Sequence, residues 1–177
     1  MSHRISSANR RVASYIFLLV LLLSSAGVAQ DETRSRIHLV IDKSDFKLYV
    51  FDADKPMHTF PIAVGKNAGD KQRVGDYRTP EGKFYISKIQ DSRAWSHDFR
   101  DGKGKIKGAY GPWFLRLYTG ANATKSGKAW TGIAIHGTHD PSLIGKMVTE
   151  GCVRLRNNDV QVLKGMISVG TRVTIRE

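Results

Sequence analysis

Short apolar runs separated by polar turns constrain the fold of this chain most. Beyond residue 36, β-branched and aromatic residues gather in brief stretches, and none has the length or the period of a long amphipathic helix. These stretches are 37–41, 46–51, 59–64, 83–89, 113–118, 133–135 and 172–175. The sequence therefore predicts a mainly β domain, with the polar segment 42–45 as a hairpin turn between the first two strands.

Helical signal is confined to two short segments, 141–148 and 159–167, and Asn157 and Asn158 are N-cap candidates for the second. The Gly-punctuated polar stretches 65–78 and 92–110 are expected to be long surface loops. Loops of that length in a compact domain often line a functional site. We therefore expect one or two short helices beside a site that these loops border.

The N-terminus has the order of a secretory signal peptide. Three arginines precede the apolar run 15–23, and small residues occupy 24–29. Because the run is shorter than the roughly 20 residues of a membrane-spanning helix, we predict a signal peptide over 1–29, cleaved after Ala29. Extending the apolar run back to Val12 leaves an uncleaved membrane anchor as the alternative. The leader predicts an exported protein of the periplasm or cell wall that contacts the membrane only through the transient signal peptide.

The remainder is predicted to be a short linker over 30–36 and one domain over 37–176, since a chain of this length needs only one core. The full chain has 28 Lys and Arg against 16 Asp and Glu, a formal net charge of +12. Such a balance suits a polyanionic partner. Export favours acidic envelope polymers over nucleic acid, and a basic surface without a specific partner is the alternative.

Cys152 is the only cysteine in the sequence. It has no intrachain partner, although thiols in exported proteins are ordinarily oxidised in pairs. Such a lone thiol is either a buried passenger or a nucleophile. Its sequence neighbours favour the nucleophile.

Two nearby segments carry the remaining chemistry: Ile-Ala-Ile-His-Gly-Thr over 133–138 and Thr-Glu-Gly-Cys-Val-Arg over 149–154. They resemble the catalytic signature of the L,D-transpeptidase (YkuD-type) family, in which a strand ends in His-Gly-Thr/Ser and Ser/Thr-x-Gly-Cys-Val/Ile-Arg follows a helical turn. Upstream, Val-Gly at 64–65 and Thr-Pro-Glu-Gly-Lys-Phe at 79–84 also match. The resemblance covers roughly 36–176. It implies a YkuD-like β-sandwich or partial barrel and makes 37–176 the catalytic domain.

The residue types also make chemical sense, because a thiol needs a base to become a thiolate. We expect Cys152 to be the nucleophile and His136 its general base and acid. A Gly-Cys step on a turn lets backbone N–H groups point at an incoming carbonyl, so the N–H groups of Gly151 and Cys152 are oxyanion-hole candidates. Three further candidates could orient the imidazole: Gly137 through its carbonyl, Thr138 and Thr149.

Arg154 lies two residues beyond the thiol, which places both side chains on one face of a strand. It is expected to bind a substrate carboxylate, to stabilise the thiolate, or to form a structural salt bridge. Tyr110 and His58 are further substrate-binding candidates from surface segments. A zinc site at His136, His139 and Asp140 is a weak alternative, because the pair of histidines follows a strand and has a glycine between its members. We therefore expect no metal and no cofactor.

Glu150 departs from the family pattern, in which many members have His immediately before Gly-Cys. A carboxylate that pointed inward there would raise the pKa of the thiol. We therefore expect Glu150 to face outward or to pair with a Lys or Arg. Asn157 and Asp159 are interpreted as helix-capping rather than catalytic residues.

The resemblance implies a peptidoglycan L,D-transpeptidase. The Cys152 thiolate would attack the carbonyl of the third residue of a tetrapeptide stem, and terminal D-alanine would leave. A side-chain amine of another stem would then resolve the thioester and form a 3-3 cross-link. Water as acceptor would make the enzyme an L,D-carboxypeptidase or endopeptidase, and an envelope lipoprotein lysine would make it an anchoring enzyme. Two readings from other classes are a non-catalytic peptidoglycan-binding module and a zinc hydrolase.

Overall fold

The computed structural model describes residues 36–100 and 102–177. The predicted signal peptide over 1–29, and all of the predicted linker except Arg36, lie outside the described residues. Within them, no helix combines the length and the apolar character needed to cross a membrane.

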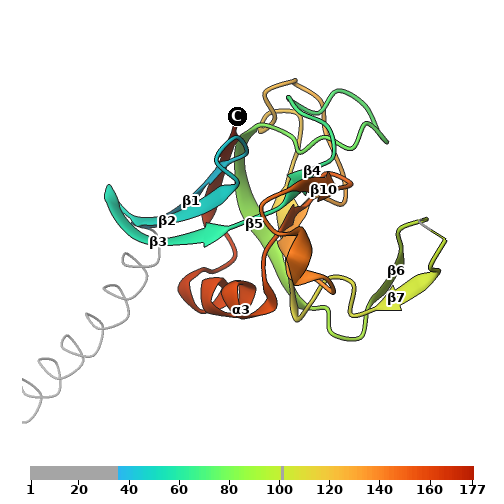
Figure 1. Ribbon diagram of the computed structural model, residues 1–177. Coiled ribbons are helices and arrows are strands. Elements are labelled where there is room, and N and C mark those ends of the chain that lie inside the picture. Colours follow the sequence, from blue (N-terminus) through green and yellow to red (C-terminus); the bar gives the residue numbers. More distant parts are fainter. Residues whose placement is uncertain (1–35, 101) are drawn as a thin grey trace, which may run out of the picture. The chain divides into compact units, whose positions relative to one another are not determined.

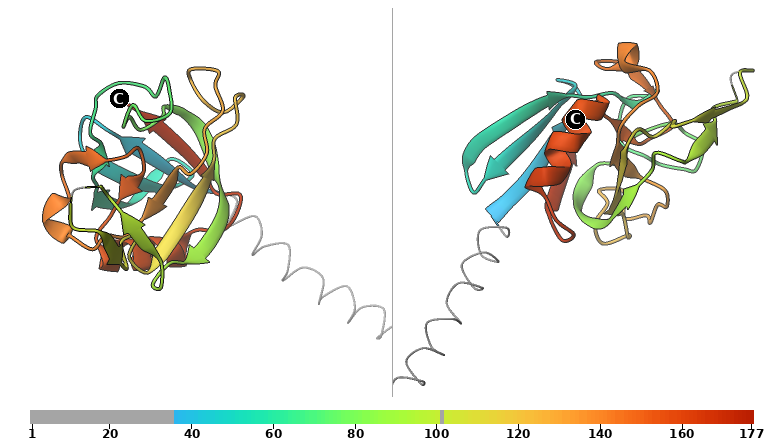
Figure 2. Two further views of the ribbon diagram at one scale, coloured as in Figure 1. Left: turned by 90° about the vertical axis from the view of Figure 1, so that its right-hand side faces the viewer. Right: turned by 90° about the horizontal axis from the view of Figure 1, so that it is seen from below.

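An eight-stranded sheet, curled into a half-barrel, dominates the domain (Figures 1 and 2). Its strand order is β11-β9-β8-β5-β12-β1-β2-β3. The strands are β1 Ile37–Asp42, β2 Lys47–Asp52, β3 Lys55–Pro61, β5 Gly82–Asp91, β8 Trp113–Tyr118, β9 Ala134–His136, β11 Val153–Arg154 and β12 Arg172–Arg176. The predicted mainly β fold is confirmed, and each predicted run contributes to a strand.

The first hairpin illustrates why these residues form strands. Leu39 and Ile41 alternate with more exposed neighbours and are fully buried, as are Leu48 and Val50 on the opposing strand. This period-two burial places one face of β1 and β2 on the core. The predicted turn between them is confirmed, and the Asp42 carboxylate closes it by accepting hydrogen bonds from Ser44 Oγ (2.8 Å) and Asp45 N–H (3.1 Å).

Strand β12 joins the two halves of the sheet. It pairs parallel with β1, where Arg172 lies opposite His38, and antiparallel with β5, where Val173 lies opposite Phe84. Val173 and Phe84 belong to the single hydrophobic core, as do Leu115, Ile135, Val153 and Leu155 beneath the strands that carry the site. The two strands that carry the site, β9 and β11, are therefore held in place by the packing of their side chains in the core.

Two small sheets correct the predictions for the loops. Strand β4 (Val64–Gly65) pairs with β10 (Met147–Thr149), and β6 (Ser96–Asp98) pairs with β7 (Lys105–Lys107). The segment predicted as a loop over 92–110 therefore contains a hairpin, which projects from the sheet (Figures 1 and 2).

The helix predicted over 141–148 was wrong. Only the 3-10 turn η1 (Pro141–Leu143) forms there, with Asp140 as its N-cap. Gly145 has a φ of 86°, which is outside the helical region, and the chain continues into β10. Pairing with β4 replaces the hydrogen bonds that a longer helix would have made.

Helix α3 (Asn157–Met166) packs against β8 and β9 through its buried residues Val160 and Leu163. It begins earlier than the predicted 159–167, and its N-cap is Arg156, which makes no side-chain capping bond. The capping role predicted for Asn157 was therefore wrong, and its amide has another partner near the site.

Candidate active site

A cavity of about 730 Å³ lies where β9 ends and β11 begins. Of the residues predicted from the sequence, Cys152, His136, Arg154 and Tyr110 line it. The loop between β4 and β5 and the β6–β7 hairpin contribute opposite parts of its wall. The described lining residues include four basic side chains and two acidic ones: Lys66, Lys71, Arg100 and Arg154 against Asp98 and Glu150. Because Lys71 is paired with Asp76, a smaller excess of basic side chains remains, and it favours an anionic ligand.

His136 is the last residue of β9 and is 2% exposed. Its Nδ1 lies 2.7 Å from the Gly137 carbonyl oxygen. Because a carbonyl only accepts, Nδ1 carries the proton and Nε2 of the neutral ring keeps its lone pair. The ring stacks on Phe114 (5.6 Å between centroids, 12°) and meets Tyr110 edge-on (5.0 Å, 79°). These contacts hold the imidazole in one orientation, in which Nε2 is the unprotonated, basic nitrogen.

Parallel pairing of β9 and β11 places Cys152 and His136 on adjoining backbone segments of the cavity wall. His136 lies opposite Arg154 and Ile135 opposite Val153, so Cys152 stands at the start of β11 beside Ala134. The thiol donates to the Gly132 carbonyl at 3.3 Å, and the Ala134 N–H donates to the sulfur. The backbone just before β9 and at its first residue therefore supplies both an acceptor for the thiol proton and a donor to the sulfur.

The thiol and the imidazole are both neutral at pH 7. Burial raises the pKa of the Cys152 thiol to about 11, although the Ala134 N–H and the Arg154 guanidinium oppose this shift. Burial, together with Arg154, lowers the pKa of His136 to about 3. A resting thiolate–imidazolium pair is therefore disfavoured.

Thr149 shapes the turn that presents the thiol. Its hydroxyl donates to the Cys152 carbonyl at 2.6 Å and accepts the Gly151 N–H at 3.1 Å. The Gly151 N–H thus already has an acceptor within the turn, and its place in an oxyanion hole stays a prediction. Gly151 is needed for another reason: its φ is 128°, and a Cβ there would lie 2.9 Å from the Arg78 carbonyl oxygen.

The three candidates for orienting His136 have different roles. Gly137 contacts the ring directly, whereas Thr149 acts on the Cys152 turn. The Thr138 hydroxyl bonds the backbone of Asp140, and the Thr138 N–H donates to Asn157 Oδ1 at 2.8 Å. Asn157 therefore fastens the segment after His136 to α3. The sequence did not reveal this role, because Asn serves both as a helix cap and as a residue that hydrogen-bonds to a loop.

Arg154 is 3% exposed, and its guanidinium lies 5.5 Å from the centroid of the Phe99 ring. None of the ion pairs among the described residues involves Arg154, and its Nε has no hydrogen-bond partner among them. A structural salt bridge within the described chain is therefore not its role. A buried cation on a cavity wall that makes no direct ion pair among the described residues suits an anionic ligand group.

Glu150 neither faces away from the site nor pairs with Lys or Arg, so that expectation was wrong. It lines the cavity, and its Oε2 lies 3.2 Å from His97 Nε2. His97 Nδ1 in turn lies 2.9 Å from the Tyr110 hydroxyl. His58, by contrast, is exposed on β3, where it stacks on Phe60 (5.1 Å between centroids), and it is not among the residues that line the cavity.

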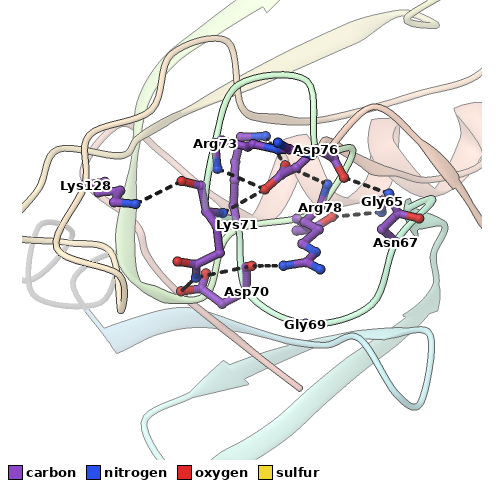
Figure 3. A network of polar contacts seen from close by, with 12 residues as sticks. Gly65, Asn67, Gly69, Asp70, Lys71, Arg73, Asp76, Arg78 and Lys128 are labelled. Carbon is purple, nitrogen blue, oxygen red and sulfur yellow. Dashed lines mark hydrogen bonds and ion pairs between the residues drawn. The ribbon is translucent and has the colours of Figure 1, made fainter.

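The cavity wall between β4 and β5 is built around the buried carboxylate of Asp76 (Figure 3). Asp76 Oδ1 accepts from Lys71 Nζ at 2.7 Å and from the Arg78 N–H at 3.1 Å, while Oδ2 accepts from the N–H groups of Gln72 (2.7 Å) and Arg73 (3.1 Å). Lys71 itself lines the cavity. One acidic side chain thus fixes the shape of this wall.

Metal ligands do not gather in the part of the chain that the structure describes. No group of three or more His, Cys, Asp or Glu side chains there is arranged to hold an ion.

Comparisons with known proteins identify the family of the chain. The family model YkuD, described as L,D-transpeptidase catalytic domain, matches residues 36–175. The YkuD protein of Bacillus subtilis strain 168 is 35% identical over 122 residues, which cover 69% of this chain and 55% of that protein. The chain spans about half the length of the curated relatives it matches.

Two solved structures have a similar fold. Bd1075 from Bdellovibrio bacteriovorus is 25% identical with a TM-score of 0.59, over 82% of this chain and 49% of that one. L,D-transpeptidase 3 from Mycobacterium tuberculosis, in complex with a faropenem-derived adduct, is 17% identical with a TM-score of 0.55, over 80% of this chain and 60% of that one.

Proposed function

Because the chain belongs to the YkuD family of L,D-transpeptidase catalytic domains, we propose that it forms 3-3 cross-links between peptidoglycan stems through a thioester on Cys152. One observation carries the proposal: the only thiol lines the same cavity as a neutral imidazole that is fixed through Nδ1 with Nε2 as its base. The stem peptides are the substrates, and no cofactor is required.

In the first step, His136 Nε2 takes the thiol proton as sulfur attacks the carbonyl of the third stem residue. The same proton then passes from His136 to the leaving amine of D-alanine, and the C–N bond breaks. The thioester keeps the acyl group until a second stem's amine attacks. Arg154 binds a carboxylate of the donor stem, a role supported by its burial without a direct ion pair among the described residues.

Acylation by a β-lactam tests the nucleophile. Intact mass is measured after incubation with a carbapenem, for the wild type and for Cys152→Ala. We expect one adduct on the wild type and none on the variant. The choice of a β-lactam as the probe follows the faropenem-derived adduct of the M. tuberculosis protein. Absence of an adduct on both proteins would favour a non-catalytic wall-binding module, which Cys152→Ser should leave fully able to bind peptidoglycan.

The acceptor is tested with tetrapeptide stems. A 3-3 dimer indicates transpeptidation, whereas a tripeptide without dimer indicates an L,D-carboxypeptidase. Transfer to a peptide that carries a lysine from an envelope lipoprotein would indicate an anchoring enzyme. Metal analysis of the purified protein addresses the zinc alternative, which stoichiometric zinc would support.

Export to the periplasm or cell wall is a further part of the proposal, supported by the order of residues over 1–29. N-terminal sequencing of the mature protein should begin at Gln30. Retention of the leader in a membrane fraction would favour the uncleaved anchor.

A further inference from the structure

Glu150, His97 and Tyr110 form a hydrogen-bonded chain that the reaction described above does not use. The carboxylate contacts His97 Nε2 at 3.2 Å, and the Tyr110 hydroxyl contacts His97 Nδ1 at 2.9 Å. The order is carboxylate, imidazole, hydroxyl. It is the order in which enzymes move a proton from a hydroxyl to an imidazole that a carboxylate stabilises.

The partners fix the direction of each hydrogen bond. An ionised carboxylate only accepts, so His97 Nε2 carries the ring proton and donates it to Glu150. Nδ1 of the neutral ring is then an acceptor, and the Tyr110 hydroxyl donates to it. Burial and the proximity of Cys152 and Glu150 raise the pKa of Tyr110, so its phenol stays protonated. Tyr110 can therefore pass a proton on while it receives another.

The chain leads from the reacting groups to solvent. Tyr110 lines the cavity beside Cys152 and touches the edge of the His136 ring. At the other end, the side chains of His97 and Glu150 are 29% and 42% exposed. A proton that enters at Tyr110 can therefore leave at the surface without passing through His136.

The surroundings of His97 are mixed in charge. Glu150 faces it from the turn before Cys152, Tyr110 from the segment before β8, and the Phe99 ring lies 4.6 Å away. On β7, its cross-strand neighbour Ile106 is flanked by Lys105 and Lys107. His97 therefore has one carboxylate in direct contact and two lysines on the neighbouring strand.

The acceptor amine brings a proton that has to be removed. An alkyl ammonium with the ordinary pKa of about 10.4 is unprotonated in roughly one molecule in a few thousand at pH 7, and only the unprotonated amine can attack a thioester. His136 is poorly suited to this task, because burial and the nearby Arg154 disfavour a charged ring there. It is also needed to return a proton to sulfur.

We propose that Tyr110, His97 and Glu150 form a proton relay that deprotonates the ammonium group of the acyl acceptor. This inference rests on the proposed function. An N–H proton of the ammonium passes to Tyr110 Oη as the hydroxyl proton passes to His97 Nδ1, which leaves a neutral amine and an imidazolium beside the Glu150 carboxylate. His97 then releases its proton to water.

The remaining bonds are made and broken at Cys152. The neutral amine attacks the thioester carbon, the C–S bond breaks, and the second N–H proton travels through His136 Nε2 to sulfur. One amide bond forms, and the enzyme returns to its starting protonation state.

The test separates the two half-reactions in Tyr110→Phe, His97→Gln and Glu150→Gln, with Tyr85→Phe as the control, since Tyr85 is exposed on β5 away from the cavity. Formation of the thioester from a tetrapeptide is followed by intact mass, and its transfer to a lysine-type amine by product analysis at pH 7. We expect each relay variant to lower the rate of transfer at least tenfold. This loss should be at least five times as large as any loss in the rate of thioester formation. The control variant should change neither rate.

Two rescues distinguish a relay from a merely structural role. Raising the pH to 9 supplies neutral amine directly, and hydroxylamine is largely unprotonated at pH 7, so both should restore transfer in the variants to within about threefold of the wild type. Equal losses in both half-reactions, unchanged transfer at pH 7, or failure of both rescues would overturn the relay. Failure of the wild type to form a thioester would instead overturn the proposed function itself.

Discussion

Replacing Asp76 by Asn tests how the wall of the cavity is held. The carboxylate accepts two hydrogen bonds on each oxygen: from Lys71 and Arg78 on Oδ1, and from Gln72 and Arg73 on Oδ2 (Figure 3). Asn has one accepting oxygen, so its amide N–H₂ would face two donors. In either orientation, Lys71 also loses its counter-charge.

The cost follows from burial. The side chains of Lys71 and Asp76 are each 7% exposed, and removing one partner of a buried pair costs about 3–5 kcal/mol. Because this surface loop can rearrange to hydrate Lys71, we expect a loss near the lower end, about 3 kcal/mol of unfolding free energy. For a domain of this size that corresponds to a Tm lower by about 9 °C.

The pH dependence gives the prediction a sign. Burial alone would raise the pKa of Asp76, but the Lys71 ammonium and the backbone N–H donors outweigh it and hold the pKa well below its usual value. Such a group stabilises the fold above its unfolded pKa of about 4, and this stabilisation is lost as the pH falls below that value. The gap between wild type and Asp76→Asn should therefore narrow by about 1 kcal/mol between pH 7 and pH 3.

Urea melts at pH 7 and pH 3 measure both quantities. Asp54→Asn, at an exposed position in the turn between β2 and β3, is the matched control and should lie within about 0.5 kcal/mol of the wild type. A change below about 1 kcal/mol for Asp76→Asn at pH 7 would refute the reasoning, as would a gap that does not narrow at low pH.

Three further results are expected. Asn157→Ala removes the acceptor of the Thr138 N–H, so turnover should fall at least tenfold while the unfolding free energy falls by about 1 kcal/mol, and Asn157→Asp should restore most of the turnover. The carbapenem acylation rate of Cys152 should vary less than about threefold from pH 6 to 8, because the thiol and His136 are both neutral across this window; a tenfold rise per pH unit would indicate a free thiolate. Arg154→Met should raise the tetrapeptide KM at least tenfold in steady-state assays without lowering the Tm, because it removes a buried cation that has no ion pair in the described chain; a lower Tm with unchanged KM would contradict its assignment to substrate.

Strands were predictable from the sequence because their signal is local. The alternation of Leu39 and Ile41 with more exposed residues is visible within β1 alone. The segment 141–148 was not predictable in this way, because Met147–Thr149 becomes a strand only through pairing with Val64–Gly65, which is distant in the chain. No local pattern contains that partner.

For the candidate site too, local motifs were predictable, whereas contacts between distant residues were not. Cys152 and His136 lie in short motifs and were found by residue type and order. The contact of Glu150 with His97 spans 53 residues, and His97 reaches it from a hairpin that was predicted as a loop. The hydrogen bond from the Gly151 N–H to the Thr149 hydroxyl was not predicted, because it depends on a turn geometry that the sequence does not encode locally.

The central position of β12 also has a kinetic consequence. Strands β1 to β3 reach the remainder of the large sheet only through β12, near the end of the sequence, where Arg172 meets His38. Sheets dominated by such distant pairings fold in milliseconds to seconds rather than microseconds, because a long loop must close before any contact compensates for it. Until β12 docks, the edges of β1 and β5 are both open, and an unfinished chain is exposed to pairing with its neighbours.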